Sequence, residues 1–264
     1  PADHPVIVHL PDAAQLEHWA SAVPGRAQRL ASRFWPGPLT LVLPRAASVH
    51  EVVTGGQDTV GLRVPSHPLA LELLRRFGRG LAAPSANKFG RLSPTTAEHV
   101  RSELGESVDL ILDGGACQVG IESTIVDLSG DEPALLRPGR ISKQELERTL
   151  GVDLRIGRSG SPRTPGMLPI HYAPKTPVRI VPTKIIEAES HRAVAVLARR
   201  PRPESKGGTR WIHAPSDAAA YARELYGNLR ALDQADAEVI LVEALPESPD
   251  WVAVRDRLTR ATSA

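Results

Sequence analysis

Apolar and polar positions along the chain repeat with two periods, one typical of strands and one typical of helices. Short apolar runs predict strands, and apolar residues three to four positions apart predict helices. In the first part of the chain we expect strands at 5–9, 39–43, 60–64, 81–83, 108–112, 123–128 and in the run that ends at Arg137. Helices are expected at 12–19, 26–35, 66–77, 95–104 and after Ser142. Several strands follow one another without a helix between them, which favours a mixed sheet.

Three of these helices carry end signals. Ser66 is expected to cap the helix that Gly78 ends, because glycine tolerates the left-handed backbone that closes helices. The sequences TTAE at 95–98 and SKQE at 142–145 match the capping box, in which a hydroxyl and a Glu bind each other's backbone amides. The apolar run at 81–83 is expected to be the end of a buried strand.

Residues 157–177, with the sequence GRSGSPRTPGMLPIHYAPKTP, interrupt the alternation. The segment is rich in Gly and Pro and has no apolar period, which predicts a linker. The alternation then resumes, with strands expected at 178–181, 193–197 and 239–242 and helices at 216–232 and 251–259. We therefore expect a large α/β domain at 1–156, the linker at 157–177 and a smaller α/β domain at 178–264.

Composition narrows the class of protein. The chain has 264 residues, of which 41% are hydrophobic, enough for a sizeable core. No apolar run approaches the roughly 18 residues that a membrane helix needs, and no secretory signal is visible. The single cysteine, Cys117, excludes an internal disulfide and suits a reducing cytoplasm, and we expect it to be a small buried residue. A net charge of +2 and 4% aromatic residues indicate no nucleic-acid-binding stripe.

The sequence lacks the common motifs of nucleotide, metal and nucleophile chemistry. It contains no Walker loop, no GxGxxG, no CxxC, no HExxH and no GxSxG. Its nine histidines are scattered, so we expect no metal site built from side chains. No residue is assigned as a catalytic acid or base.

Polar side chains recur where the predicted strands end, which is where α/β proteins bind ligands. They are His9, Arg63, Ser85, Asn87, Ser93, Ser123, Thr124 and Arg137. The guanidinium groups suit a carboxylate and a phosphate, and the hydroxyl and amide groups supply neutral donors. Taken singly, each residue also has a structural explanation, such as a turn closed by Ser or Asn or a solvated arginine. Together they predict an α/β protein that binds phosphate or carboxylate.

Seven segments are more specific than this pattern: PVIVHL, FWPGPLTLVL, VGLRVPSHP, APSANKFGRLSPTTAEHV, GIESTIVDL, LLRPGRIS and PGMLPIHYAPKTPV. In this order they resemble the threonylcarbamoyl-AMP synthase family. The resemblance covers residues 1–177, and the rest is similar to the longer, two-domain branch of the family. It implies an α/β fold with a YrdC-like twisted mixed sheet and flanking helices, followed by a smaller Rossmann-like open α/β domain.

The resemblance implies an enzyme that makes threonylcarbamoyl-adenylate and pyrophosphate from L-threonine, bicarbonate and ATP, with Mg²⁺ accompanying ATP. The product would pass to the transferase complex that modifies an adenosine in tRNA, in the cytoplasm and without a membrane; direct tRNA contact stays open. Implied threonine contacts are His9, Arg63, Ala83 and Ser123. Implied ATP contacts are His4, Thr59, Ser85, Asn87, Ser93, Arg137 and Tyr172, the last from a linker that folds over the nucleotide.

One departure and two alternatives accompany this interpretation. The family has a Lys-x-Arg pair before the segment that corresponds to residues 1–9, so we expect a further N-terminal portion, without which ATP binding would be weakened. One alternative is a YrdC-like module that binds nucleotide or RNA without catalysis, although Arg63, Ser85 and Arg137 are all present. The other, carbamoyl transfer from carbamoyl-adenylate, would need acylphosphatase-like or zinc-finger domains, which the sequence lacks. The role of the second domain stays open.

Overall fold

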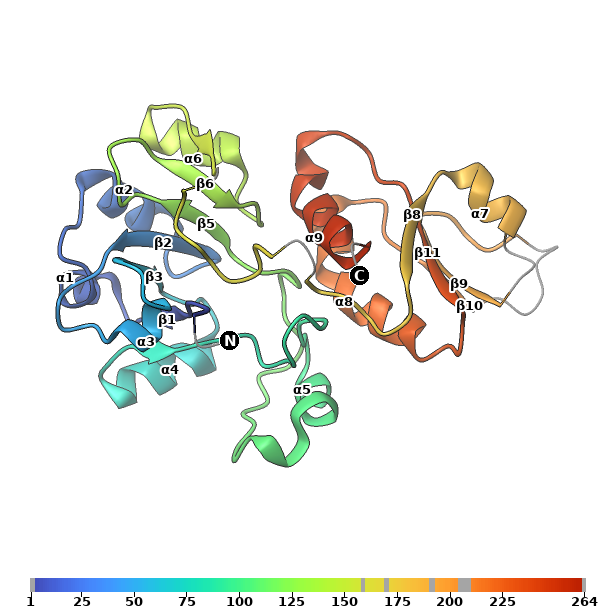
Figure 1. Cartoon of the computed structure of the whole chain (residues 1–264), viewed down its shortest axis with the longest axis horizontal. Helices are drawn as coiled ribbons and strands as arrows, with labels where there is room; N and C mark the ends of the chain where they lie inside the picture. Colours follow the sequence, from blue (N-terminus) through green and yellow to red (C-terminus); the bar gives the residue numbers. More distant parts are fainter. Residues whose placement is uncertain (1–2, 158–159, 169–170, 190–192, 204–209, 263–264) are drawn as a thin grey trace. The chain divides into compact units, whose positions relative to one another are not determined.

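The computed structural model describes residues 3–157, 160–168, 171–189, 193–203 and 210–262. They form two compact units, each with its own sheet (Figure 1). The first unit comprises Pro1–Pro84 and Glu122–Met167, and the second comprises Ser85–Ile121 and Leu168–Ala264. Neither unit is continuous in sequence, whereas the order of elements alone suggested domains at 1–156 and 178–264. Parts of the expected linker, 158–159 and 169–170, lie outside the described residues.

A seven-stranded mixed sheet forms the centre of the first unit, with the strand order β4-β1-β3-β2-β5-β6-β7. Its strands are β1 (Ile7–His9), β2 (Leu39–Pro44), β3 (Thr59–Arg63), β4 (Leu81–Ala82), β5 (Thr124–Asp127), β6 (Ala134–Arg137) and β7 (Arg155–Ile156). The pairs β1–β3, β2–β5 and β6–β7 are parallel, and the other three pairs are antiparallel. This confirms the mixed sheet predicted from the order of the elements.

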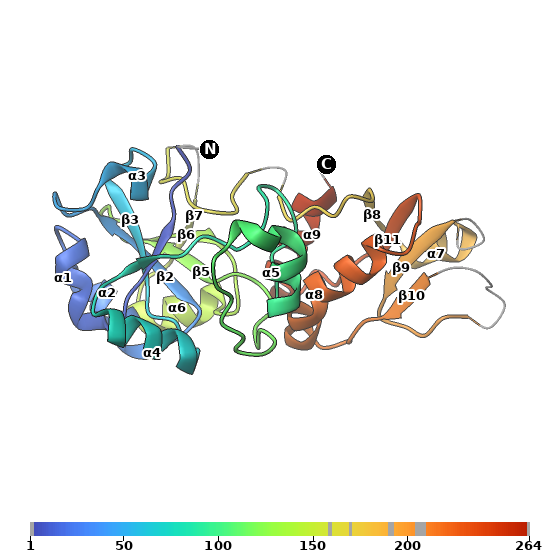
Figure 2. The ribbon, with the colours of Figure 1, turned by 90° about the horizontal axis from the view of Figure 1, so that it is seen from below.

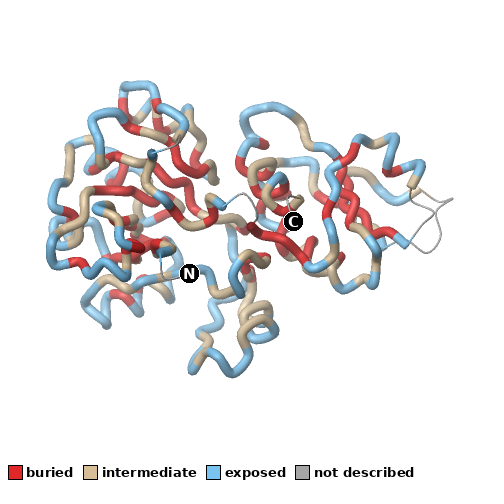
Figure 3. Tube along the Cα trace, in the orientation of Figure 1, coloured by how far each residue is buried: buried red, intermediate tan, exposed pale blue. Residues whose placement is uncertain are grey.

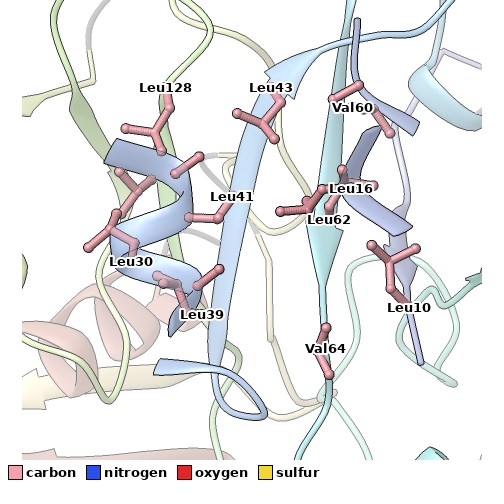
Figure 4. Packing of buried hydrophobic residues seen from close by; sticks show 14 of the residues in the cluster. Leu10, Leu16, Leu30, Leu39, Leu41, Leu43, Val60, Leu62, Val64 and Leu128 are labelled. Carbon is pink, nitrogen blue, oxygen red and sulfur yellow. The ribbon is translucent and has the colours of Figure 1, made fainter. Parts of the chain in front are cut away.

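The two faces of this sheet differ because side chains alternate along each strand. The helices of the unit are η1 (Ala13–Gln15), α1 (Leu16–Trp19), α2 (Gly25–Phe34), α3 (Glu51–Thr54), α4 (Pro68–Phe77) and α6 (Lys143–Leu150). On one face, Leu39 and Leu41 of β2 join the core that contains Leu16 of α1 and Leu30 of α2 (Figure 4). The other face carries a smaller apolar cluster of strand residues that includes Val42. Both faces of β2 are therefore buried (Figure 3).

The second unit contains a four-stranded parallel sheet with the strand order β10-β9-β11-β8. The strands are β8 (Val178–Val181), β9 (Val194–Ala198), β10 (Arg210–His213) and β11 (Val239–Glu243). The helices are α5 (Ala97–Leu104), η2 (Gly105–Ser107), α7 (Thr183–Glu189), α8 (Ala218–Asp233), η3 (Pro249–Trp251) and α9 (Val252–Thr262). Helices α8 and α9 pack on one face of the sheet and α7 on the other (Figures 1 and 2). This open sheet with helices on both faces confirms the expected Rossmann-like arrangement.

Three predictions about strands and burial are wrong. Residues 108–112 form no strand, and Leu110 and Leu112 are 75% and 50% exposed, because a short apolar run does not supply a partner strand. The run at 81–83 contributes a two-residue strand at the sheet edge, partly exposed rather than buried, because it pairs only with β1. Cys117 is exposed, since it follows 108–112 in an irregular segment.

The helix caps agree with the sequence in part. The capping box of Ser142 is confirmed, and Gly78 ends α4 with a φ of 73° as expected. However, α4 is capped by His67, whose Nδ1 accepts from the amide of Leu69, and not by Ser66. Helix α5 is capped by Thr96, one residue later than expected. No helix in the described ranges combines the length and apolar character needed to cross a membrane.

Candidate functional site

The sequence-predicted residues fall in both units, so each group is described within its own unit. His4, His9, Thr59, Arg63, Ala83, Ser123 and Arg137 belong to the first unit, and Ser85, Asn87, Ser93 and Tyr172 to the second. In the first unit, the register of the parallel pair β1–β3 places His9 directly beside Arg63. Ser123 precedes β5 and Arg137 ends β6, and hydrogen bonds join these two residues.

Arg137 is a buried cation, with only 2% of its surface exposed. Its Nε and Nη2 donate to the backbone oxygen and to Oγ of Ser123, both at 3.1 Å, and its Nη1 donates to the oxygen of Pro165 at 2.7 Å. All three acceptors are neutral, and no carboxylate among the described residues forms an ion pair with Arg137. Because a buried charge is costly without an opposite charge, this arrangement favours an anionic ligand.

Thr40 extends this network and was missed by the sequence reasoning. Its hydroxyl lies 2.8 Å from Oγ of Ser123, and the residue is fully buried. Thr40 sits in β2 between Leu39 and Leu41, which belong to the core on the opposite face. The available signal was a lone hydroxyl in the apolar run LTLVL, at the position that strand alternation directs away from that core.

His9 and Arg63 carry different charges at neutral pH. Burial lowers the pKa of His9 to about 3, and the positive charge of Arg63 contributes to this shift. His9 is therefore a neutral hydrogen-bonding group, and Arg63 is the cation of the pair. The Nε of Arg63 donates to the oxygen of Gly37 at 3.0 Å, which orients the guanidinium group.

A pocket lies on the face of the sheet that carries Thr40 and Val42, and its polar lining includes Thr40, Thr59, Gln57, Arg163 and Thr164. The Gln57 side chain forms two hydrogen bonds with the linker backbone here. Its Nε2 donates to the Arg163 oxygen at 3.0 Å, and its Oε1 accepts from the Arg163 backbone amide at 2.6 Å. Thr164 is 5% exposed, and its hydroxyl has no hydrogen-bond partner among the described residues. Thr164 is thus a second candidate ligand contact that the sequence reasoning missed.

His4 and Ala83 are the two further predicted residues of the first unit. Burial lowers the pKa of His4, and the positive charge of Arg163 adds to this shift, although Asp3 opposes it. The amide of Ala83 donates to the oxygen of Ile7 at 2.9 Å, so β4 continues its pairing with β1 by one residue.

In the second unit, Ser85, Asn87 and Ser93 occupy one loop, residues 85–96. Ser85 is exposed and Ser93 is 8% exposed. The side-chain amide of Asn87 donates to the oxygens of Lys88 at 2.8 Å and of Arg91 at 3.2 Å. Asn87 therefore closes the loop on itself in this structure, and its contact with a nucleotide stays a prediction.

Tyr172 lies in the core of the second unit. It is 1% exposed and has a φ of 60°, which is unusual for a residue with a side chain. Its ring centroid lies 5.6 Å from that of Tyr226, and the Arg257 guanidinium lies 5.4 Å from the Tyr172 ring. The side chain thus packs within the second unit, and its contact with a nucleotide also stays a prediction.

Two family models match the chain and together cover nearly all of it. The model described as "Telomere recombination", which groups Sua5, YciO and YrdC proteins, matches residues 1–139. The model described as "Threonylcarbamoyl-AMP synthase, C-terminal domain" matches residues 141–263.

Individual relatives show the same likeness over the whole chain. The threonylcarbamoyl-AMP synthase of Pyrococcus abyssi is 39% identical over 99% of this chain and 81% of the relative. That of Bacillus subtilis is 38% identical over 99% of this chain and 80% of the relative. The crystal structure of P. abyssi Sua5 complexed with L-threonine matches with a TM-score of 0.89 and 38% identity, over 99% of this chain and 81% of that one. This chain therefore belongs to the threonylcarbamoyl-AMP synthase family, in its two-domain form.

Proposed function

We propose that this protein forms threonylcarbamoyl-adenylate and pyrophosphate from L-threonine, bicarbonate and ATP. The observation that carries the proposal is family membership along the whole chain, since both family models match and the compared synthases align with 99% of it. The L-threonine complex of the P. abyssi relative supports threonine as a substrate here.

Arg63 is proposed to bind the carboxylate of threonine through its guanidinium fork. His9, which lies beside Arg63, is neutral and adds no second positive charge. The single charge of Arg63 would then match the single charge of the threonine carboxylate. Ala83 and Ser123 complete the proposed threonine contacts. The threonine amine, in its unprotonated form, would then attack carbon dioxide derived from bicarbonate and lose a proton to give a carbamate.

A carbamate oxygen would next attack the α-phosphorus of ATP in line, and the bond to the pyrophosphate group would break. Such a step depends mainly on positioning and charge stabilisation. Arg137 supports it, because this buried guanidinium has no described carboxylate partner and would stabilise phosphate charge. The other proposed ATP contacts are His4, Thr59, Ser85, Asn87, Ser93 and Tyr172.

Magnesium is proposed to enter with ATP. The described residues include no group of three or more His, Cys, Asp and Glu side chains that could bind a metal ion. Phosphate oxygens of the nucleotide would therefore supply its main ligands, and the ion would neutralise charge on the departing pyrophosphate.

The linker is proposed to protect the product. The Gln57 bonds hold the Arg163 backbone beside the pocket that Thr59 and Thr164 line. Excluding water there would protect a hydrolysable mixed anhydride. We propose that the product passes to the tRNA-modifying transferase complex in the cytoplasm, without a requirement for direct tRNA contact here.

The test is a reaction of the purified chain with ATP, bicarbonate, L-threonine and Mg²⁺. We expect pyrophosphate release that requires all three substrates, and a product with the mass of threonylcarbamoyl-adenylate. Release that continues without threonine would contradict the proposal. Binding of ATP with no pyrophosphate release would favour a non-catalytic nucleotide-binding module instead.

A further inference from the structure

The 85–96 loop is attached to the C-terminal part of the chain through Leu92. Leu92 is 3% exposed and belongs to the same hydrophobic cluster as Tyr226 and Leu229 of α8. Gly120, which follows the loop and α5, lies so close to α8 that an added Cβ would be 2.3 Å from the Cα of Arg223. The 85–121 segment is thus packed on α8, a helix of its own unit, at two points, Leu92 and Gly120.

Arg230 of α8 holds two points of the same loop, one directly and one through Glu103. Its Nη2 donates to the oxygen of Leu92, and its Nη1 lies 2.9 Å from Oε2 of Glu103 on α5, which lies beside α8 (Figure 2). Oε1 of Glu103 accepts from the amide of Lys88 at 3.3 Å. The Arg230 and Glu103 side chains are only 15% and 13% exposed, so solvent screens this ion pair weakly.

The linker also holds this loop, through Gly90 and Arg91. The amide of Ala173 donates to the oxygen of Gly90 at 3.0 Å, and Arg91 forms a parallel β-bridge with Ala173. The Nη1 of Arg91 donates to the oxygen of Pro174 at 3.3 Å. With the internal bonds of Asn87, these contacts leave residues 87–92 fixed between α8 and the linker.

We propose that Arg230, together with Glu103, is a positioning residue for nucleotide binding. The pair fixes the backbone between residues 88 and 92, and so orients the hydroxyl and amide groups of the loop that faces ATP. The C-terminal domain then acts as the support of the nucleotide loop. This inference rests on the proposed function, because it takes the loop to be an ATP contact.

If the Arg230–Glu103 ion pair had only a structural role, its loss would lower the melting temperature and leave the affinities for both substrates unchanged. A positioning role predicts a selective loss, in which ATP affinity falls and L-threonine affinity does not, because Arg63 and His9 belong to the other unit.

The experiment measures ATP and L-threonine dissociation constants separately by titration calorimetry on the full chain. For Arg230→Ala we expect the ATP Kd to rise about tenfold or more, as the loss of charge-assisted hydrogen bonds implies. The L-threonine Kd should stay unchanged. Glu224→Ala is the control, since this charged residue is exposed on the same helix, and it should change neither constant.

A second variant tests the inference if Arg230→Ala folds poorly. Replacing the pair together, with Arg230→Met and Glu103→Leu, removes both charges and fills similar volume, which buried pairs often tolerate. We expect this variant to keep its melting temperature, to lose ATP affinity, and to exchange the amide hydrogens of residues 88–92 faster.

An unchanged ATP Kd in both variants, or equal losses for ATP and L-threonine, would overturn the inference. Faster exchange without loss of ATP affinity would overturn it too. The proposed function is judged on the wild-type chain alone: if that chain makes the adenylate while the variants bind ATP normally, only the inference fails. If the wild-type chain binds no ATP, both fail.

Discussion

Arg137 donates two hydrogen bonds to Ser123, from Nε to the backbone oxygen and from Nη2 to Oγ, each at 3.1 Å. Only a planar group with several donors can form both of these bonds while its Nη1 also donates to the Pro165 oxygen. The hydroxyl of Ser123 also lies 2.8 Å from that of Thr40. A residue proposed to bind threonine is therefore fixed by a residue proposed to bind phosphate.

Arg137→Lys should lower kcat/KM by about tenfold to a hundredfold, because lysine keeps the charge but loses the bonds to Ser123. Initial rates of pyrophosphate release at varied ATP and threonine concentrations measure this. Arg140→Lys, at an exposed position in the following loop, is the control. Wild-type kinetics in Arg137→Lys would show that charge alone suffices.

Arg63→Ala should raise the KM for threonine far more than the KM for ATP. The reason is that a guanidinium fork bound to the carboxylate is lost, while the groups proposed for phosphate remain. The measurement is a pair of KM values from steady-state rates, with Arg75→Ala on the exposed side of α4 as the control. Equal effects on both KM values would contradict the assignment.

His9 should make the free energy of unfolding depend on pH. The folded protein keeps His9 neutral down to a pKa of about 3, whereas the unfolded chain protonates it near 6.5. Because the unfolded state binds more protons between these values, stability falls as the pH drops below about 6.5, by about 2 kcal/mol at pH 5.

Urea unfolding of the wild type and of His9→Gln at pH 7 and pH 5 measures this contribution. The wild type should lose about 2 kcal/mol more than His9→Gln on acidification. His18→Gln, at an exposed position, should behave as the wild type does. Parallel losses in wild type and His9→Gln would show that His9 has an ordinary pKa.

Gln57→Ala should release the linker and expose the product to water. Two hydrogen bonds to the Arg163 backbone are lost, so AMP from hydrolysis should increase relative to threonylcarbamoyl-adenylate. Chromatography of the two nucleotides gives the ratio, with Gln28→Ala on the exposed side of α2 as the control. An unchanged ratio would show that these bonds do not protect the product.

Local patterns predicted β2 within one residue, because the period of its apolar residues depends only on the strand itself. The same reasoning failed for 108–112, since pairing depends on a distant partner. It also could not foresee that Leu92 is buried against α8, which depends on tertiary contacts.

The candidate site shows the same limit. Chemistry and the family resemblance pointed to Arg63 and Arg137, because guanidinium groups at strand ends are conspicuous in a sequence. Thr40 and Thr164 were missed, since a threonine in an apolar strand or in a Pro-rich linker looks ordinary until a fold brings another group next to it.

The order in which the strands pair has a consequence for folding during synthesis. β2 pairs on one side with β3, which follows closely, but on the other side with β5, where Leu39 meets Thr124. The ribosome must therefore produce the whole 85–121 segment, which belongs to the other unit, before the first sheet can be completed. Until then the nascent chain exposes one edge of β2, a strand that is buried in the finished fold, and an unpaired strand edge of this kind is a surface that chaperones bind.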